Sequence, residues 1–275
     1  MAGDQLDQAL RLVEGWPVDH AAVAVVGDEG TQASFGPVDR RFPVASVTKL
    51  LTALAVLVAI EEGTVSLAEL AGPPGATVAH LLAHASGLSP SEPDRVLAPP
   101  GTRRIYSGAG FEVLADHLAG RSGLAFPDYL GAAVLAPLGL SATSLDGSPA
   151  AGITSTVADL ARLAGELLDP RLIDHSTLER ATTVAFPGLV GVLPGYGRQE
   201  PNDWGLGFEL RSHKRPHWTG HRNGPATFGH FGQTGTLLWV DPAARVALVV
   251  LTDRSFGPWA VDRWPALSDA VLGAA

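Results

Sequence analysis

The sequence contains no cysteine, which excludes disulfide bonds, thiolate metal sites and a cysteine nucleophile. Any covalent chemistry must therefore use oxygen or nitrogen atoms. Basic residues are also scarce, with 19 lysines and arginines against 28 acidic residues and a formal net charge of −9. A chain with this charge is not expected to bind nucleic acid or an anionic membrane surface.

Long apolar runs are missing as well. The longest run, Leu50 to Ile60, is about half the ~20 residues that a membrane-spanning helix requires, and Lys49 and Glu61 bound it. The N-terminal residues lack the basic and then apolar pattern of a secretory signal, which predicts a cytoplasmic protein. What the chain does contain is 46% hydrophobic residues over 275 positions, enough for a large core in one domain or in two interleaved lobes.

The predicted elements follow the order helix, strands, helix, a long helical segment, strands and helix. Apolar periodicity predicts helices over residues 4–14, 46–63 and 258–273, and alternation predicts strands within 21–36 and 204–254. Short helices between Pro/Gly loops are predicted at 78–84, 110–119, 156–168 and 176–182.

This order predicts an α+β fold. An antiparallel sheet lobe would form from residues 1–63 plus 204–275, with the N- and C-terminal helices packed on it and an all-helical lobe of residues 64–203 inserted. A cleft between the lobes is then expected, and small molecules usually bind in such clefts.

Ser46 and Lys49 lie one helical turn apart at the start of the apolar helix, so the amine can approach the hydroxyl. Burial among leucine and valine side chains favours a neutral amine, which can accept the hydroxyl proton. The backbone N–H of Ser46 at the helix N-terminus can help to hold an oxyanion. A capping serine with a lysine that reaches solvent would give the same spacing, so further segments must decide.

Tyr106 lies in a turn before a helix, in the segment PPGTRRIYSGAGFEVLADHL. A phenol beside a lysine ammonium can be drawn toward phenolate and act as a general base, whereas a half-buried tyrosine that fixes a loop is the alternative. Arg103 and Arg104 could steer an anionic substrate or lower the pKa of this phenol; the alternative is a solvated loop charge.

His230, Phe231 and Gly232 lead into an edge strand in the segment ATFGHFGQTGTLLWV. Small residues there would let a substrate lie close to the strand, and the N–H of Gln233 could supply a second oxyanion donor. A glycine-rich hairpin with a structural histidine is the alternative. Two aromatic residues flanking the approach to His230 are expected at the pocket edge: Trp218 and Phe228.

Three motifs together resemble the signature set of the serine β-lactamase and penicillin-binding-protein superfamily: Ser46-Val47-Thr48-Lys49, Tyr106-Ser107-Gly108 and His230-Phe231-Gly232. The resemblance is greatest to the branch of class C β-lactamases, D-alanyl-D-alanine carboxypeptidases and family VIII esterases. Segments 80–88 (HLLAHASGL), 152–163 (GITSTVADLARL) and 205–210 (GLGFEL) extend it over nearly the whole chain.

The resemblance implies an acyl-enzyme mechanism without a metal or cofactor. Ser46 would be the nucleophile, Lys49 and Tyr106 would share proton transfer, and the Ser46 and Gln233 amides would hold the oxyanion. Residues along the bound substrate would be Ser107, Gly108, His230, Phe231 and Gly232.

Two positions depart from the pattern of the lactamases and peptidases that the chain resembles. Gly108 stands where those proteins usually have asparagine, which removes an amide that would bind an acylamide side chain. His230 stands in place of a lysine, so a substrate carboxylate would lose a fixed cation. Both changes favour a small uncharged ester, and the predicted function is that of an esterase with this fold.

The sequence leaves three alternatives open. The first is a weak β-lactamase, a D-alanyl-D-alanine carboxypeptidase or an amidase, and the second is a non-catalytic ligand-binding member of the superfamily.

The third is a zinc hydrolase that uses histidine pairs at i and i+4. The pair His80 and His84 lacks the glutamate of the His-Glu-x-x-His motif, and the pair His213 and His217 spans a proline, so no metal site is predicted. The expected partner is a small-molecule ester or amide.

Overall fold

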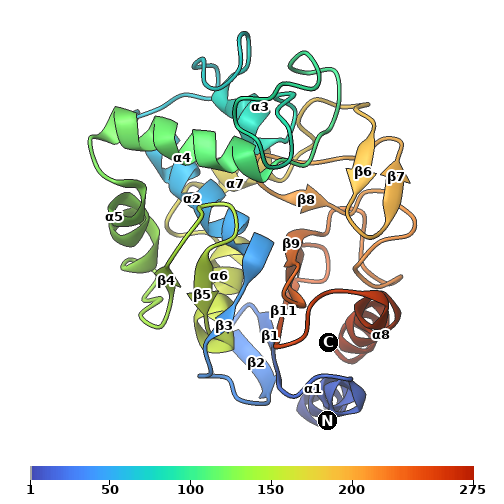
Figure 1. Ribbon diagram of the computed structural model, residues 1–275. Coiled ribbons are helices and arrows are strands. Elements are labelled where there is room, and N and C mark those ends of the chain that lie inside the picture. The colour runs from blue at the N-terminus through green and yellow to red at the C-terminus, as the bar shows by residue number, and fades with distance from the viewer. Residues whose placement is uncertain (1) are drawn as a thin grey trace.

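The computed structural model describes residues 2–275 and contains one large antiparallel sheet built from both ends of the chain (Figure 1). Its six strands lie in the order β2-β1-β11-β10-β9-β8. Their bounds are β1 Ala21–Gly27, β2 Gly30–Phe35, β8 Glu209–Leu210, β9 Phe228–Gly232, β10 Thr236–Asp241 and β11 Val246–Thr252. The α+β class and the antiparallel sheet predicted from the sequence are confirmed.

Helices cover both faces of this sheet. On one face lie α1 (Ala2–Leu10), the 3-10 helix η1 (Arg11–Gly15) and α8 (Pro258–Ala274); α6 (Val157–Leu168) packs on the other (Figure 1). Side chains alternate accordingly along β1, because successive residues of a strand point to opposite faces. Val23 and Val25 join the cluster with α1 and α8, whereas Ala24 and its neighbours at 22 and 26 join the cluster with α6.

Helix α2 (Thr48–Glu61) is buried around nearly its whole circumference, with every residue from Thr48 to Ala59 buried. A helix that is apolar on all sides is stable only inside a protein, and α2 packs against α4 (Gly108–Ser122), α5 (Phe126–Leu130) and the π-helix η3 (Gly131–Leu135). The 3-10 turn η2 (Ala45–Val47) precedes it, and Gly63 with a φ of 75° follows its end. This placement carries Lys49 into the interior.

Several short helices and strands complete the fold. The sequence patterns predicted these helices but not these strands. The helices are α3 (Val78–Leu82) and α7 (His175–Ala181), and the strands are β3 (Phe42–Pro43), β4 (Ser144–Leu145), β5 (Ile153–Ser155), β6 (Gly191–Leu193) and β7 (Gly197–Gln199). Strands of two or three residues are too short to show an alternating pattern, which explains why they were not predicted.

The division into a sheet lobe and an inserted helical lobe stays a prediction. Helix α6, which belongs to the segment 64–203, packs directly on β1 and β11 of the sheet and shares a hydrophobic core with α2. Within the described part of the chain, no helix is long and apolar enough to cross a membrane.

Candidate active site

Ser46 lies in the turn η2 directly before the buried helix α2, half-exposed, with its side chain lining a pocket. The preceding residue, Ala45, has a φ of 46°, a left-handed conformation that costs a non-glycine residue free energy. Such backbone strain concentrates at functional sites, and here it lies next to the predicted nucleophile.

The Lys49 amine is buried beside Ser46. Its Nζ donates to the carbonyl oxygen of Ala150 at 2.8 Å and lies 3.4 Å from Ser46 Oγ. The lysine is only 2% exposed, and burial lowers its pKa to about 7 although the charge of Glu112 acts in the opposite direction. A substantial fraction of neutral amine is therefore present at neutral pH, which is what a base for Ser46 requires.

Tyr106 is the second hydroxyl at Ser46. Its OH donates to Ser46 Oγ at 2.8 Å, and its ring lies under the Lys49 amine, 4.8 Å from Nζ to the ring centroid. Burial raises the pKa of Tyr106 well above its usual value, so the phenol is protonated at rest. The resting phenolate considered from the sequence does not fit this environment, whereas the protonated hydroxyl donates a hydrogen bond to Ser46 Oγ. The catalytic roles of Tyr106 and Lys49 stay predictions.

His230 is oriented by the strand that carries it. Its Nδ1 lies 2.7 Å from the carbonyl oxygen of Phe231, which fixes the ring proton on Nδ1 and leaves Nε2 as an acceptor. That Nε2 lies 3.4 Å from the hydroxyl of Tyr106. Burial, with the charge of Lys49 as a second cause, lowers the pKa of His230 to about 3, so this histidine is neutral.

The end of β9 packs tightly against the turn that carries Ser46. A Cβ on Gly232 would lie 2.3 Å from the Val44 carbonyl oxygen and 3.2 Å from the Cβ of Ala45, so only glycine permits this approach. Gln233 follows and lines the same pocket as Ser46. The N–H groups of Ser46 and Gln233 thus belong to adjacent segments, and their role as oxyanion donors stays a prediction.

A small pocket of about 60 Å³ lies over these groups. Its lining residues are Ser46, Tyr106, Leu193, Pro194, Trp204, Glu209, His230, Phe231 and Gln233. We call it the inner pocket. A larger groove of about 350 Å³, which we call the outer groove, shares Tyr106 and Pro194 with it and continues toward Arg103. The sequence patterns did not assign four of these lining residues to the site: Leu193, Pro194, Trp204 and Glu209. The segment GLGFEL, which contains Glu209, contributed only to the family resemblance.

Two predicted pocket residues lie elsewhere. Trp218 is fully buried in the core formed with α1 and α8, and its Nε1 donates to Glu209 at 2.9 Å. Phe228 is buried in the opposite core and packs edge-on against Phe208. Neither residue lines the inner pocket, because both side chains fill the space that the sheet and its covering elements leave between them.

Ser107 and Gly108 belong to the start of α4 rather than to the pocket lining. The Oγ of Ser107 accepts the N–H of Gly110 at 2.9 Å, which caps the helix, and donates to the Ser89 carbonyl at 2.6 Å. The N–H of Gly108 donates to the Pro90 carbonyl at 2.8 Å. Both residues therefore fix the turn that follows Tyr106.

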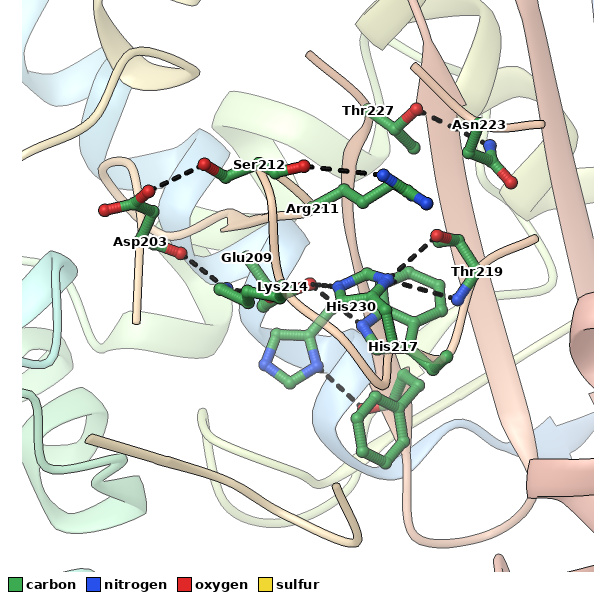
Figure 2. Close-up of polar contacts among 12 residues, drawn as sticks. Asp203, Glu209, Arg211, Ser212, Lys214, His217, Thr219, Asn223, Thr227 and His230 are labelled. Atoms are coloured by element: carbon green, nitrogen blue, oxygen red, sulfur yellow. Dashed lines mark hydrogen bonds and ion pairs between the residues drawn. The ribbon is translucent and has the colours of Figure 1, made fainter. Parts of the chain in front are cut away.

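A buried charged cluster borders the inner pocket (Figure 2). Glu209 Oε1 pairs with Lys214, and Oε2 lies 2.9 Å from both His217 Nε2 and Trp218 Nε1. The Lys214 amine also donates to the Asp203 carbonyl at 2.7 Å. Burial acts to raise the pKa of Glu209, but His217 and Lys214 outweigh it and bring the pKa to about 2. Glu209 is thus an ionised carboxylate.

Three of the four histidines considered as zinc ligands have other partners. His80 Nδ1 accepts the N–H of Thr77 at the start of α3, and His84 Nδ1 accepts the N–H of Ser107 at 3.1 Å. His217 binds Glu209. Among the residues that the structure describes, no group of three or more histidines and carboxylates is placed to hold a metal ion.

The chain is similar to known proteins over nearly its whole length. The family model for beta-lactamase matches residues 17–272. A crystal structure of a beta-lactamase from Mycobacterium bovis is 58% identical in sequence, with a TM-score of 0.95 and coverage of 96% of this chain and 98% of that one.

Two further comparisons are more distant. The D-alanyl-D-alanine-carboxypeptidase/endopeptidase AmpH of Escherichia coli K12 is 28% identical over 142 residues, which are 38% of this chain and 37% of that enzyme. The match therefore spans little more than a third of that curated relative. EstCE1, a hydrolase with promiscuous acyltransferase activity, has a TM-score of 0.79 at 17% identity, covering 99% of this chain and 98% of that one; this likeness concerns the fold alone.

Proposed function

Because the chain belongs to the beta-lactamase family, we propose that it is a serine hydrolase that cleaves small esters through an acyl-enzyme on Ser46. The observation that carries the proposal is that the partly exposed hydroxyl of Ser46 lies next to two buried groups that can transfer a proton, the Tyr106 hydroxyl and the Lys49 amine. Ser46 Oγ lies 2.8 Å from the Tyr106 hydroxyl and 3.4 Å from an amine whose pKa is about 7. An acylation step needs such a nucleophile, base and acid together.

In the proposed reaction, Ser46 Oγ attacks the acyl carbon and its proton passes to the neutral amine of Lys49. The Ser46 and Gln233 amides stabilise the oxyanion that forms. Tyr106 then donates its proton to the departing alcohol oxygen and regains one from the Lys49 ammonium. Water attacks the acyl-enzyme in the second half, its proton follows the same route to Ser46 Oγ, and the carboxylic acid leaves.

Electrostatics of the inner pocket favour an uncharged substrate. Of the nine residues that line it, Glu209 alone carries a formal charge, and His230 is neutral. A substrate carboxylate would find no cation among these side chains and would lie near the Glu209 carboxylate. An ester also has a better leaving group than an amide.

Hydrolysis of β-lactams is the second candidate, and one observation favours it. The crystal structure that is 58% identical over nearly the whole chain is described as a beta-lactamase. If this chain shares that activity, a β-lactam would acylate Ser46 by the same route, with its carboxylate lying in the outer groove near Arg103.

Kinetics with p-nitrophenyl acetate, p-nitrophenyl butyrate and nitrocefin test the proposal. We expect ester turnover with little nitrocefin hydrolysis, a loss of about 10³-fold or more in kcat in Ser46→Ala, and a loss of about 10²–10⁴-fold in Tyr106→Phe. Intact mass should show an acyl adduct on the wild-type protein that Ser46→Ala lacks.

Tyr129→Phe is the matched control, since the Tyr129 hydroxyl donates to Glu62 at 2.6 Å in another part of the molecule. Its ester turnover should match that of the wild type. Full activity of Ser46→Ala on every ester would overturn the assignment. Ser46-dependent hydrolysis of nitrocefin that exceeds ester hydrolysis would replace the esterase with the second candidate.

A further inference from the structure

Two side chains of the inner pocket keep hydrogen-bonding capacity that the protein does not fill. The Trp204 Nε1–H is buried and has no acceptor in the described part of the chain, although Trp204 is only 1% exposed. Buried N–H groups in native proteins nearly always have a partner, so a lone indole N–H in a pocket lining points to a ligand. The ring is held by edge-on contacts with His84 at 4.6 Å and His230 at 5.5 Å between centroids.

Glu209 provides the complementary acceptor. An ionised carboxylate has about four acceptor positions, two on each oxygen. His217 and Trp218 occupy Oε2, and Lys214 occupies one position on Oε1. One position on Oε1 is left, and Glu209 lines the inner pocket together with Trp204.

One donor and one acceptor together match a hydroxyl, which accepts one hydrogen bond and donates one. An ammonium group could not accept from Trp204, and the charge of Lys214 already compensates that of Glu209. An ionised carboxylate has no hydrogen to donate to Glu209. The hydroxyl must also lie close to Ser46, because both share a pocket of about 60 Å³.

We propose that the inner pocket binds a short acyl group that carries a hydroxyl, which accepts a hydrogen bond from Trp204 Nε1 and donates one to Glu209 Oε1. The preferred substrates are then esters of small hydroxy acids. This inference deepens the proposed function and rests on it, since the acyl group is the one that Ser46 receives.

The test compares p-nitrophenyl hydroxyacetate with p-nitrophenyl propionate, whose acyl groups differ by a hydroxyl in place of a methyl. The measured quantity is the ratio of kcat/KM for the two esters in each protein, because the intrinsic reactivity of the esters cancels when proteins are compared. The ratio should fall at least tenfold from wild type to Trp204→Phe, since a site built to bind a hydroxyl discriminates against its absence.

A second variant addresses Glu209 without leaving a lone buried charge. In Glu209→Gln/Lys214→Met, the amide oxygen can still accept from His217 and Trp218, while the NH₂ group replaces Oε1 and can no longer accept from a hydroxyl. The same fall in the ratio is expected. Trp264→Phe is the matched control, because the Trp264 indole N–H is likewise buried without an acceptor but lies in the core with α8, and its ratio should equal that of the wild type.

An unchanged ratio in folded Trp204→Phe or in the double variant overturns the inference; the two groups then hold a structural water. If propionate hydrolysis still depends on Ser46 in that case, the proposed function stands without the inference. If neither ester is hydrolysed in a Ser46-dependent manner, the proposed function fails and the inference fails with it.

Discussion

At the scale of single residues, Lys49 is the group whose environment most affects the chemistry. A lysine in water keeps its proton until about pH 10.5, and burial lowers the pKa of Lys49 to about 7. One of its hydrogens is committed to the Ala150 carbonyl, which holds the amine near Ser46. The same apolar neighbours that make Lys49 unusual in a core helix therefore lower its pKa into the range that the proposed base requires.

This environment predicts the pH dependence of activity. The kcat/KM for p-nitrophenyl acetate should rise about tenfold per unit below pH 7 and level off above it, because the neutral amine is the reactive form. The unfolded chain binds this proton up to about pH 10.5, so the contribution of Lys49 to folding stability also rises with pH between 7 and 10.5. A rate profile that stays flat from pH 5.5 to 8 would contradict the assignment of Lys49 as the base.

At the scale of elements, the site depends on the contact between the turn η2 and the end of strand β9. The turn presents Ser46 after the strained Ala45. Strand β9 brings His230 to the same pocket, and Gln233, which lines it too, directly follows the strand. The hydroxyl of Thr236 on β10 donates to the Val44 carbonyl at 2.9 Å and ties the sheet to this turn. The geometry of the site therefore follows from the register of the strands, in which Gly232 faces Thr236.

Gly232→Ala should disturb this contact. The added Cβ would lie 2.3 Å from the Val44 carbonyl oxygen and 2.4 Å from Thr236 Oγ1, so the backbone must shift. We expect a loss of about 1–3 kcal/mol in the free energy of unfolding and a loss of ester turnover of at least tenfold. Gly120→Ala on α4, where nothing lies within 4 Å of the new Cβ, should leave turnover unchanged. Normal turnover in Gly232→Ala would show that the contact does not position Ser46.

At the scale of the whole molecule, Arg104 joins the segments that surround the site. Its guanidinium donates to the carbonyls of Ala83 at 2.5 Å, Ala185 at 2.6 Å and Asn202 at 3.0 Å. It is 2% exposed, and burial lowers its pKa to about 10, so it keeps its charge at neutral pH. Arg104 thus has a structural role, whereas Arg103 is exposed beside the outer groove.

The variants Arg104→Met and Arg103→Met separate these roles. Loss of the Arg104 guanidinium leaves several buried carbonyl oxygens without a donor and should lower the free energy of unfolding by about 3–5 kcal/mol. The same change at Arg103 should stay within about 0.5 kcal/mol of the wild type. Urea unfolding measures both, and equal stability of the two variants would contradict this account.

The sequence by itself determined the features that depend on near neighbours in the chain. The spacing of Ser46 and Lys49, the apolar surroundings of that helix and the alternation in the strands at both ends are local patterns. They predicted the α+β sheet, and they predicted Ser46, Lys49 and Tyr106, which the structure brings into contact.

Only the tertiary structure decided the features that depend on collective burial and on segments far apart in the chain. It showed that Tyr106 is protonated at rest, that Trp218 and Phe228 fill the core, and that Trp204 and Glu209 line the pocket. The physical reason is that the pKa of a side chain depends on the groups that surround it and shield it from water. The same groups decide whether a buried donor or acceptor finds a hydrogen-bond partner. Residue order alone does not specify those groups, because many of them come from segments far apart in the chain.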